Sequence, residues 1–181
     1  MACAQTGTWD GFVCLALFFF SSKGLWILLA GSGKTAAFLI PSIEQLMVHG
    51  FKSAQENVIC PHTLILFPTR ELTAQISLEA RRLSYLSFIK NGVITGGQDL
   101  AKQLMDVGEK CAILIATPGR LLDILARGKL TLMSIKVLIL DEADRMLDMG
   151  FEPQIRQIVQ QEGTFSFSVF FFFIFSSLTR H

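Results

Sequence analysis

Two short stretches of this 181-residue sequence combine residue types that handle phosphate groups and metal ions. In GSGKT, residues 31–35, glycines would let backbone amides approach an anion, and a following helix would direct its positive end at the same point. Lys34 can reach the β and γ phosphates of a nucleotide, and the Thr35 hydroxyl can bind Mg²⁺. The stretch therefore indicates a nucleotide phosphate loop, with a glycine-rich turn that opens a helix as the alternative.

The second stretch is DEAD, residues 141–144, which directly follows the apolar run VLIL. A carboxylate at the carboxyl end of a buried parallel strand lies where open α/β sheets bind their ligands. Asp141 would hold Mg²⁺ through water, and Glu142 would orient and deprotonate an attacking water. The alternative is an acidic first turn that complements a helix dipole. The order of GSGKT and DEAD along the chain favours catalysis.

Composition adds few constraints on the partners of the protein. The 16 basic and 15 acidic residues nearly balance, so net charge gives no argument for nucleic acid. The four cysteines form no CxxC pair, which is typical of reduced thiols in an intracellular protein. Most of the 16 phenylalanines lie in two short segments, residues 12–20 and 165–175.

These two phenylalanine-rich segments are poor membrane spans. Residues 12–30 are barely long enough and contain Lys23, which would cost about 2.5–3.5 kcal/mol inside a bilayer. The second segment is shorter. No basic residue precedes Phe12, so a secretory signal is not indicated either. We expect no membrane association.

Between the two segments, apolar runs and helical periods alternate. Residues 34–48 are predicted to form a helix with Pro41 as a possible kink, and a second helix is indicated by an apolar stripe at helical spacing. That stripe consists of Leu72, Ile76, Ala80 and Leu83. Strands are predicted at residues 63–67, 91–95, 112–117 and 136–140. The pattern predicts an α/β fold, with a parallel sheet covered by helices on both faces.

Further motifs accompany the first two stretches. PTREL at residues 68–72, GG at 96–97, TPGR at 117–120 and DEADRMLDMGF at 141–151 follow GSGKT in order. In order and approximate spacing they resemble the DEAD-box ATP-dependent RNA helicases, most of all the Ded1 and Vasa branch. The resemblance covers residues 31–161 and 1–7.

The resemblance implies a RecA-like P-loop NTPase domain that uses ATP and Mg²⁺ and binds RNA through its sugar-phosphate backbone. By analogy, Asp141, Glu142 and Lys34 carry hydrolysis, Thr35 and Asp141 hold the metal ion, and Asp144 couples the site to the next motif. ATP would be bound by Gly31, Ser32, Gly33, Lys34 and Thr35. RNA would be bound by Pro68, Thr69, Arg70, Glu71, Gly96, Gly97, Thr117, Gly119 and Arg120. PTREL alone would equally fit a strand-to-helix turn.

The family's phosphate loop reads AQTGSGKT, whereas here AQTG ends at Gly7 and SGKT starts at Ser32. Removing the 24 residues from Thr8 to Gly31 restores the family string. We therefore divide the chain into a displaced start of the loop strand (1–7), a hydrophobic insertion (8–30), a partial helicase domain (31–161) and a tail outside the family pattern (162–181). Gly-Thr stands at the start of both odd segments, at Gly7-Thr8 and Gly163-Thr164, as a GGT codon that runs into a splice donor would give. Both segments are also rich in Phe and Ser, so we hypothesise that they are translated introns. Transcript sequencing would test this.

Burial of apolar side chains favours LWILLA, residues 25–30, as a substitute for the displaced strand. The family's adenine-reading Gln motif, its SAT motif and its second RecA-like domain are not found in these residues. We expect an ATP-binding fragment of an RNA helicase, in the cytoplasm or nucleus, that does not unwind RNA alone. A non-catalytic nucleotide- or RNA-binding isoform, or a membrane-anchored protein, are the alternatives.

Overall fold

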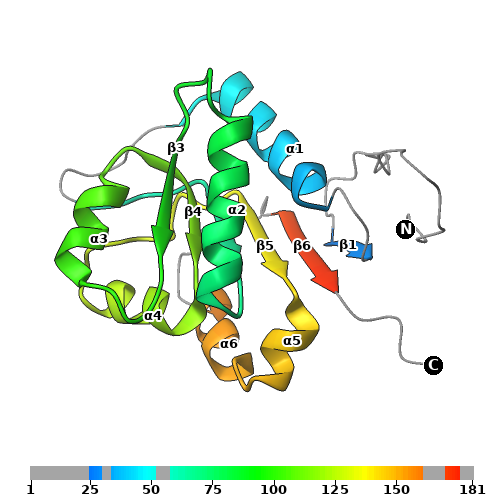
Figure 1. The fold of residues 1–181 in the computed structure, drawn as a ribbon, viewed down its shortest axis with the longest axis vertical. Coiled ribbons are helices and arrows are strands. Elements are labelled where there is room, and N and C mark those ends of the chain that lie inside the picture. The colour runs from blue at the N-terminus through cyan, green and yellow to red at the C-terminus, as the bar shows by residue number, and fades with distance from the viewer. Residues whose placement is uncertain (1–24, 30–33, 52–57, 161–169, 176–181) are drawn as a thin grey trace.

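The computed structural model describes residues 25–29, 34–51, 58–160 and 170–175 (Figure 1). Its strands are β1 (Leu25–Leu29), β2 (Thr63–Leu66), β3 (Lys90–Ile94), β4 (Cys111–Ala116), β5 (Val137–Asp141) and β6 (Phe170–Phe175). They form one sheet in the order β1-β6-β5-β2-β4-β3, and every neighbouring pair is parallel. The carboxyl ends of all the strands therefore meet at one edge.

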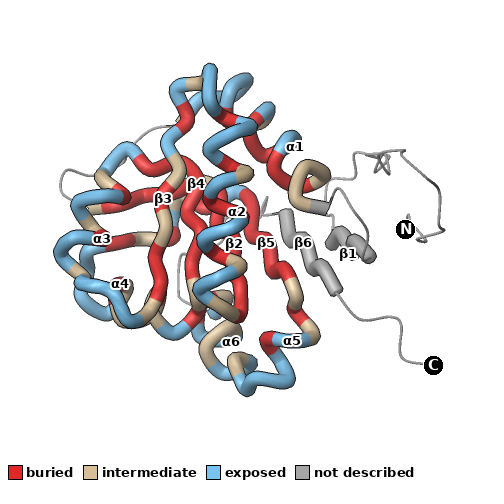
Figure 2. Tube along the Cα trace, in the orientation of Figure 1, coloured by how far each residue is buried: buried red, intermediate tan, exposed pale blue. Residues whose placement is uncertain are grey.

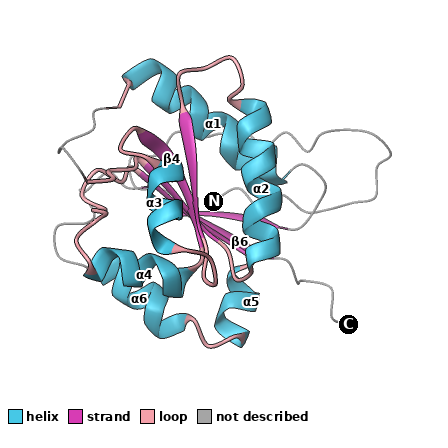
Figure 3. Cartoon of the chain, turned by 60° about the vertical axis from the view of Figure 1, so that its left-hand side comes forward, coloured by secondary structure: helices cyan, strands magenta, loops and turns pink. Residues whose placement is uncertain are grey.

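Helices connect the strands and cover both faces of the sheet, as expected (Figure 3). They are α1 (Lys34–His49), α2 (Arg70–Leu83), α3 (Leu100–Val107), α4 (Pro118–Ala126), α5 (Ala143–Asp148) and α6 (Glu152–Gln160). Residues from α1 and α2 pack in one apolar cluster, and residues from α3, α4, α5 and α6 pack in another.

Side-chain alternation along β2 explains how one strand serves both clusters. Leu64 and Leu66 belong to the cluster with α3 to α6, whereas Ile65 and Phe67 belong to the cluster with α1 and α2. Because successive strand residues point to opposite faces, an unbroken apolar run is what a strand covered on both faces requires. Figure 2 shows the result, a buried centre with exposed outer helix surfaces.

The four strands that the sequence predicted, now β2, β3, β4 and β5, lie within one residue of their predicted bounds. The first predicted helix is also present, and α1 continues through Pro41. One detail of the predicted stripe on α2 is wrong. Ile76 and Ala80 are buried, but Leu83 is 40% exposed because it is the last residue of the helix.

The substitute strand that we expected at residues 25–30 is present as β1. Its neighbour in the sheet is β6, which comes from the segment that we assigned to a tail outside the family pattern. Strand β6 also pairs with β5, so it joins β1 to the rest of the sheet. Among the described residues, β1 is hydrogen-bonded to no strand other than β6.

Candidate functional site

The predicted site residues that the structure describes, all except Gly31, Ser32 and Gly33, follow five of the six strands and gather at the carboxyl edge of the sheet. In Figure 1 the arrowheads of β3, β4, β5 and β6 all point to the lower part of the view, where this edge lies. Backbone hydrogen bonds continue just beyond the strands, from Phe67 N to Ala116 O at 3.0 Å and from Thr117 N to Ile94 O at 3.0 Å. The segments after β2, β4 and β3 are therefore held side by side.

The DEAD stretch forms a tight turn between β5 and α5. Asp141 ends β5 with only 7% of its surface exposed, and its Oδ1 accepts a hydrogen bond of 2.9 Å from the Glu142 amide. Glu142 has φ 55° and ψ 45°, the left-handed conformation that costs a non-glycine residue about 1–3 kcal/mol. Asp144 lies half-buried in the first turn of α5. Such backbone strain is concentrated at functional sites in proteins.

The Glu142 carboxylate has a cationic neighbour on α5. Its Oε2 pairs with Arg145 Nη1 at 3.1 Å, and the two side chains are 20% and 53% exposed. Water screens a pair as open as this one, so its contribution to stability is small. In this arrangement the Glu142 carboxylate points toward Arg145.

The nucleotide loop is described in part. Gly31, Ser32 and Gly33 lie outside the described residues, while Lys34 and Thr35 begin α1. Across the sheet, Asp141 is in register with Ile174, and Ile174 is in register with Leu28. Two strand spacings, about 10 Å, therefore separate the backbones of Asp141 and Leu28. The start of α1 and the DEAD turn thus follow strands that end at the same edge.

The PTREL and GG motifs contact each other through Arg70. Pro68 is buried, the Thr69 hydroxyl caps α2 by accepting from Leu72 N at 3.4 Å, and Glu71 is exposed in the first turn. The Arg70 guanidinium lies directly against Gly96 and Gly97, so closely that a Cβ on Gly97 would overlap it. Gly97 also has φ +75°, which favours glycine. The structure thus brings together two motifs, residues 68–72 and 96–97, that are well separated along the chain.

The TPGR motif forms the start of α4. Thr117 is the N-cap, but its side chain makes no capping hydrogen bond, and Pro118 occupies the first turn. A Cβ added to Gly119 would meet nothing within 4 Å. The Arg120 guanidinium is held by protein groups: Nη2 donates to Gln98 O at 2.7 Å and Nη1 pairs with Asp123 Oδ2 at 3.2 Å. The backbone amides at this end of α4 can receive a phosphate.

Three polar residues that we did not predict support this edge, namely Gln98, Gln103 and Asp123. Gln103 is 4% exposed and lies on α3 between the apolar residues Leu100, Leu104 and Val107. The sequence did contain a signal for Gln103, because this polar residue stands at a helix position where the helical period requires an apolar one.

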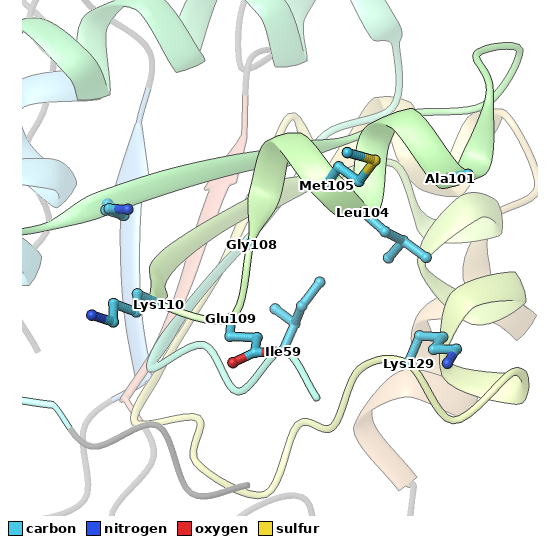
Figure 4. A pocket seen from close by; sticks show the side chains of 9 residues that line it. Ile59, Ala101, Leu104, Met105, Gly108, Glu109, Lys110 and Lys129 are labelled. Carbon is cyan, nitrogen blue, oxygen red and sulfur yellow. The ribbon is translucent and has the colours of Figure 1, made fainter. Parts of the chain in front are cut away.

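The opposite, amino edge of the sheet carries a pocket of about 590 Å³ (Figure 4). It is lined by Ile59, Lys90, Ala101, Leu104, Met105, Gly108, Glu109, Lys110 and Lys129, and by none of the predicted site residues. Two side chains at this edge have shifted pKa values. Burial and the nearby Lys136 lower the pKa of His62, and burial raises the pKa of Cys111 to about 12.

No helix within the described part of the chain is long and apolar enough to cross a membrane. A family model described as DEAD/DEAH box helicase matches residues 25–172. The chain is 50% identical over 138 residues to the probable ATP-dependent RNA helicase ddx3 of Dictyostelium discoideum. This match covers 72% of the chain but only 19% of the relative.

The solved structures that resemble this chain also include DEAD-box and helicase proteins. The yeast DEAD-box splicing factor Prp28 aligns with a TM-score of 0.75 and 33% identity, over 86% of this chain and 37% of that one. A hypothetical ATP-dependent RNA helicase from Sulfolobus tokodaii aligns with a TM-score of 0.68 and 31% identity, over 84% and 42% of the two chains. The expected RecA-like fold is confirmed by these DEAD-box neighbours. Because the family model spans most of the chain and the motifs lie at one sheet edge, this protein belongs to the DEAD/DEAH box helicase family.

Proposed function

We propose that this chain binds Mg-ATP and the RNA backbone at the carboxyl edge of its sheet, as the ATP-binding part of an ATP-dependent RNA helicase. The observation that supports the proposal is that the described residues of both motif sets follow strands that end at this one edge. The predicted nucleotide-binding residues follow β1 and β5, and the predicted RNA-binding residues follow β2, β4 and β3. Adjacent strands would thus carry the two ligands side by side.

For the nucleotide, Gly31, Ser32 and Gly33 supply backbone amides to the phosphates, and Lys34 neutralises the charge of the terminal ones. Thr35 and Asp141 hold Mg²⁺ directly or through water, and the oxygen donors of both side chains suit this ion. When bound, Mg²⁺ offsets the charge that develops on the phosphate oxygens. The hydrogen bond from the Glu142 amide to Asp141 Oδ1 supports this role, because it fixes the direction of the Asp141 carboxylate.

For hydrolysis, the Glu142 carboxylate orients a water molecule and accepts its proton as the water oxygen attacks the γ phosphorus. The bond from that phosphorus to the bridging oxygen breaks, and ADP and phosphate leave. The left-handed backbone of Glu142 supports this role, because that conformation is costly and sets the direction of the side chain. Asp144, in the first turn of α5, would couple a change at the site to a neighbouring segment.

For RNA, Arg70 and the first-turn amides of α4 would contact phosphates, together with the Thr117 hydroxyl, which no capping bond occupies. The start of α2 would be shaped by Pro68, Thr69 and Glu71. The protein backbone could approach the RNA strand closely at Gly96, Gly97 and Gly119. Arg120 would act by fixing the Gln98 carbonyl as well as by its charge. Contacts of this kind read no base sequence. The site thus suits RNA of any sequence.

The relative named above is called an ATP-dependent RNA helicase, and we extend the use of ATP and RNA from that protein to this chain. We also infer a cytoplasmic or nuclear location, where both ligands occur. The same analogy supports coupling of hydrolysis to RNA remodelling in an intact helicase.

The proposal is tested by titrating the chain with a fluorescent ATP analogue in the presence of Mg²⁺. We expect saturable binding that Lys34→Ala weakens by at least about tenfold, since the lysine contacts the terminal phosphates. Lys52→Ala is the matched control, because Lys52 lies outside the phosphate loop. Equal affinity of the Lys34→Ala chain and the unchanged chain would contradict the assignment.

A further inference from the structure

The helix α3 contains a buried amide that no motif of the family resemblance includes. Gln103 is 4% exposed and lies on the face of α3 that packs against the sheet. A buried polar side chain costs stability unless its hydrogen bonds are made, so the partners of Gln103 indicate why a glutamine stands there.

The Gln103 amide binds the turn that follows β3. Its Nε2 donates to Thr95 O at 2.8 Å and to Gln98 Oε1 at 2.9 Å. These two acceptors flank Gly96 and Gly97, the residues that lie against Arg70. Both protons of one amide group thus hold the two ends of the glycine turn.

The other end of the same amide faces α4. Gln103 Oε1 accepts a long hydrogen bond of 3.5 Å from Arg120 Nε, while Arg120 Nη2 donates 2.7 Å to the Gln98 carbonyl. Arg120 is itself fixed by Asp123, whose second oxygen accepts from Arg127 Nε at 2.9 Å. A continuous set of polar contacts therefore joins the glycine turn to the start of α4.

We infer that Gln103 is a positioning residue for RNA. It holds the glycine turn and the first turn of α4 in one fixed arrangement, so that their amides meet successive phosphates of one strand. This inference rests on the proposed RNA-binding function. It goes beyond that function by assigning the spacing of the phosphate contacts to a buried side chain that does not itself contact RNA.

The physical reason is that the two sets of amides belong to different loops. Each loop alone could turn by several degrees, and small misplacements of binding groups reduce affinity strongly. Arg70 holds the glycine turn from the α2 side, and Gln103 holds it from the α3 side. Removal of the amide leaves Thr95 O and Gln98 Oε1 without this donor and frees the turn on one side.

The test uses the full chain with Gln103→Leu, Gln103→Glu and the control Gln157→Leu, an exposed residue of α6. Affinity for a fluorescent oligouridine is measured over a range of salt concentrations. Amide hydrogen exchange is measured without RNA. Gln103→Leu keeps the size of the side chain without its polar atoms, and Gln103→Glu replaces the donating amide with acceptors.

We expect both Gln103 variants to bind oligouridine about tenfold more weakly. In Gln103→Leu the slope of log affinity against log salt should be unchanged, because this variant alters no charge. Arg70→Ala should instead reduce that slope by about one. Exchange should accelerate at residues 95–99 and 119–121 but not in β2 and β5. The control should match the unchanged chain in every measurement.

Unchanged exchange at residues 95–99, or equal acceleration throughout the sheet, would overturn the positioning role. Localised acceleration with unaltered oligouridine affinity would overturn its link to RNA. If the unchanged chain does not bind oligouridine, the proposed function fails, and the link to RNA fails with it. The exchange data would still decide whether Gln103 joins the two loops.

Discussion

The sheet has an RNA half, which carries the proposed RNA-binding residues, and a nucleotide half, which carries the proposed nucleotide-binding residues. The two halves differ in the sequence from which their strands come. In the RNA half, β2, β4 and β3 come from sequence that follows the family pattern, and their loops are tied by Arg70, Gln103 and Arg120. In the nucleotide half, β5 follows the pattern, but β1 comes from the hydrophobic insertion (8–30) and β6 from the tail (162–181).

This difference shows that strand positions and site residues place different demands on sequence. A strand inside a parallel sheet covered on both faces needs an apolar run at the right place in the chain, and LWILL and FFFFIF both meet that demand. A phosphate loop needs particular residues in a particular spacing. We therefore expect RNA binding to be less disturbed than nucleotide binding by changes in the insertion and the tail.

The largest expected effect comes from breaking β6. Phe172 pairs with Trp26 on one side and with Ile139 on the other. Phe172→Pro removes a backbone donor in the interior of the sheet, where proline is not tolerated. We expect binding of Mg-ATP to be lost while oligouridine binding persists. Phe172→Ile, which keeps the amide, should retain both. Parallel loss of both ligands in Phe172→Pro would show that the halves are not separable.

A repair of the phosphate loop should act in the opposite direction. Deletion of residues 8–31 joins Gly7 to Ser32 and restores AQTGSGKT. We expect Mg-ATP affinity to rise by about tenfold, equivalent to 1.4 kcal/mol, with oligouridine affinity unchanged. Deletion of residues 8–24 is the control, because it keeps β1 and the existing loop. A repaired chain that binds ATP no better would mean that the insertion does not disturb the site.

Relief of the strain at Glu142 should separate stability from catalysis. Glycine adopts the left-handed conformation readily, so Glu142→Gly should raise the free energy of unfolding by about 1 kcal/mol while abolishing ATP hydrolysis. Glu142→Gln should abolish hydrolysis without the gain. Denaturant unfolding and phosphate release measure the two quantities. A Glu142→Gly chain less stable than Glu142→Gln would indicate that the turn is not strained.

The smallest expected effect comes from Gly119, where the packing leaves room for a side chain. An alanine at Gly119 meets open space, so Gly119→Ala should leave stability unchanged or raise it by up to about 1 kcal/mol. If RNA approaches this backbone, oligouridine affinity should still fall a few-fold. Gly97→Ala is the contrasting variant and should be destabilised, because its φ is +75° and Arg70 lies against it. Unaltered affinity in Gly119→Ala would remove α4 from the RNA site.

The sequence predicted most of the sheet because TLIL, CAILIA and VLILD are apolar runs of strand length between helical periods. It also predicted that Asp141 lies at the carboxyl end of a buried parallel strand, which the structure confirms. The role of FFFFIF in the sheet was not predicted, because a low-complexity run gives no partner or register. The contact of Arg70 with Gly97 and the bonds of Gln103 depend on how α2, α3 and α4 pack, which local patterns do not encode.

The central claim is that the start of α1 and the DEAD turn share one metal-bound nucleotide. Paramagnetic broadening by Mn²⁺-ATP, measured on the backbone amide signals of the full chain, tests it most directly. We predict strong broadening at Lys34, Thr35, Asp141 and Glu142, and little at Lys90, Lys110 and Lys129 beside the amino-edge pocket. Broadening at only one of the two segments, or strongest broadening at the amino edge, would contradict the account.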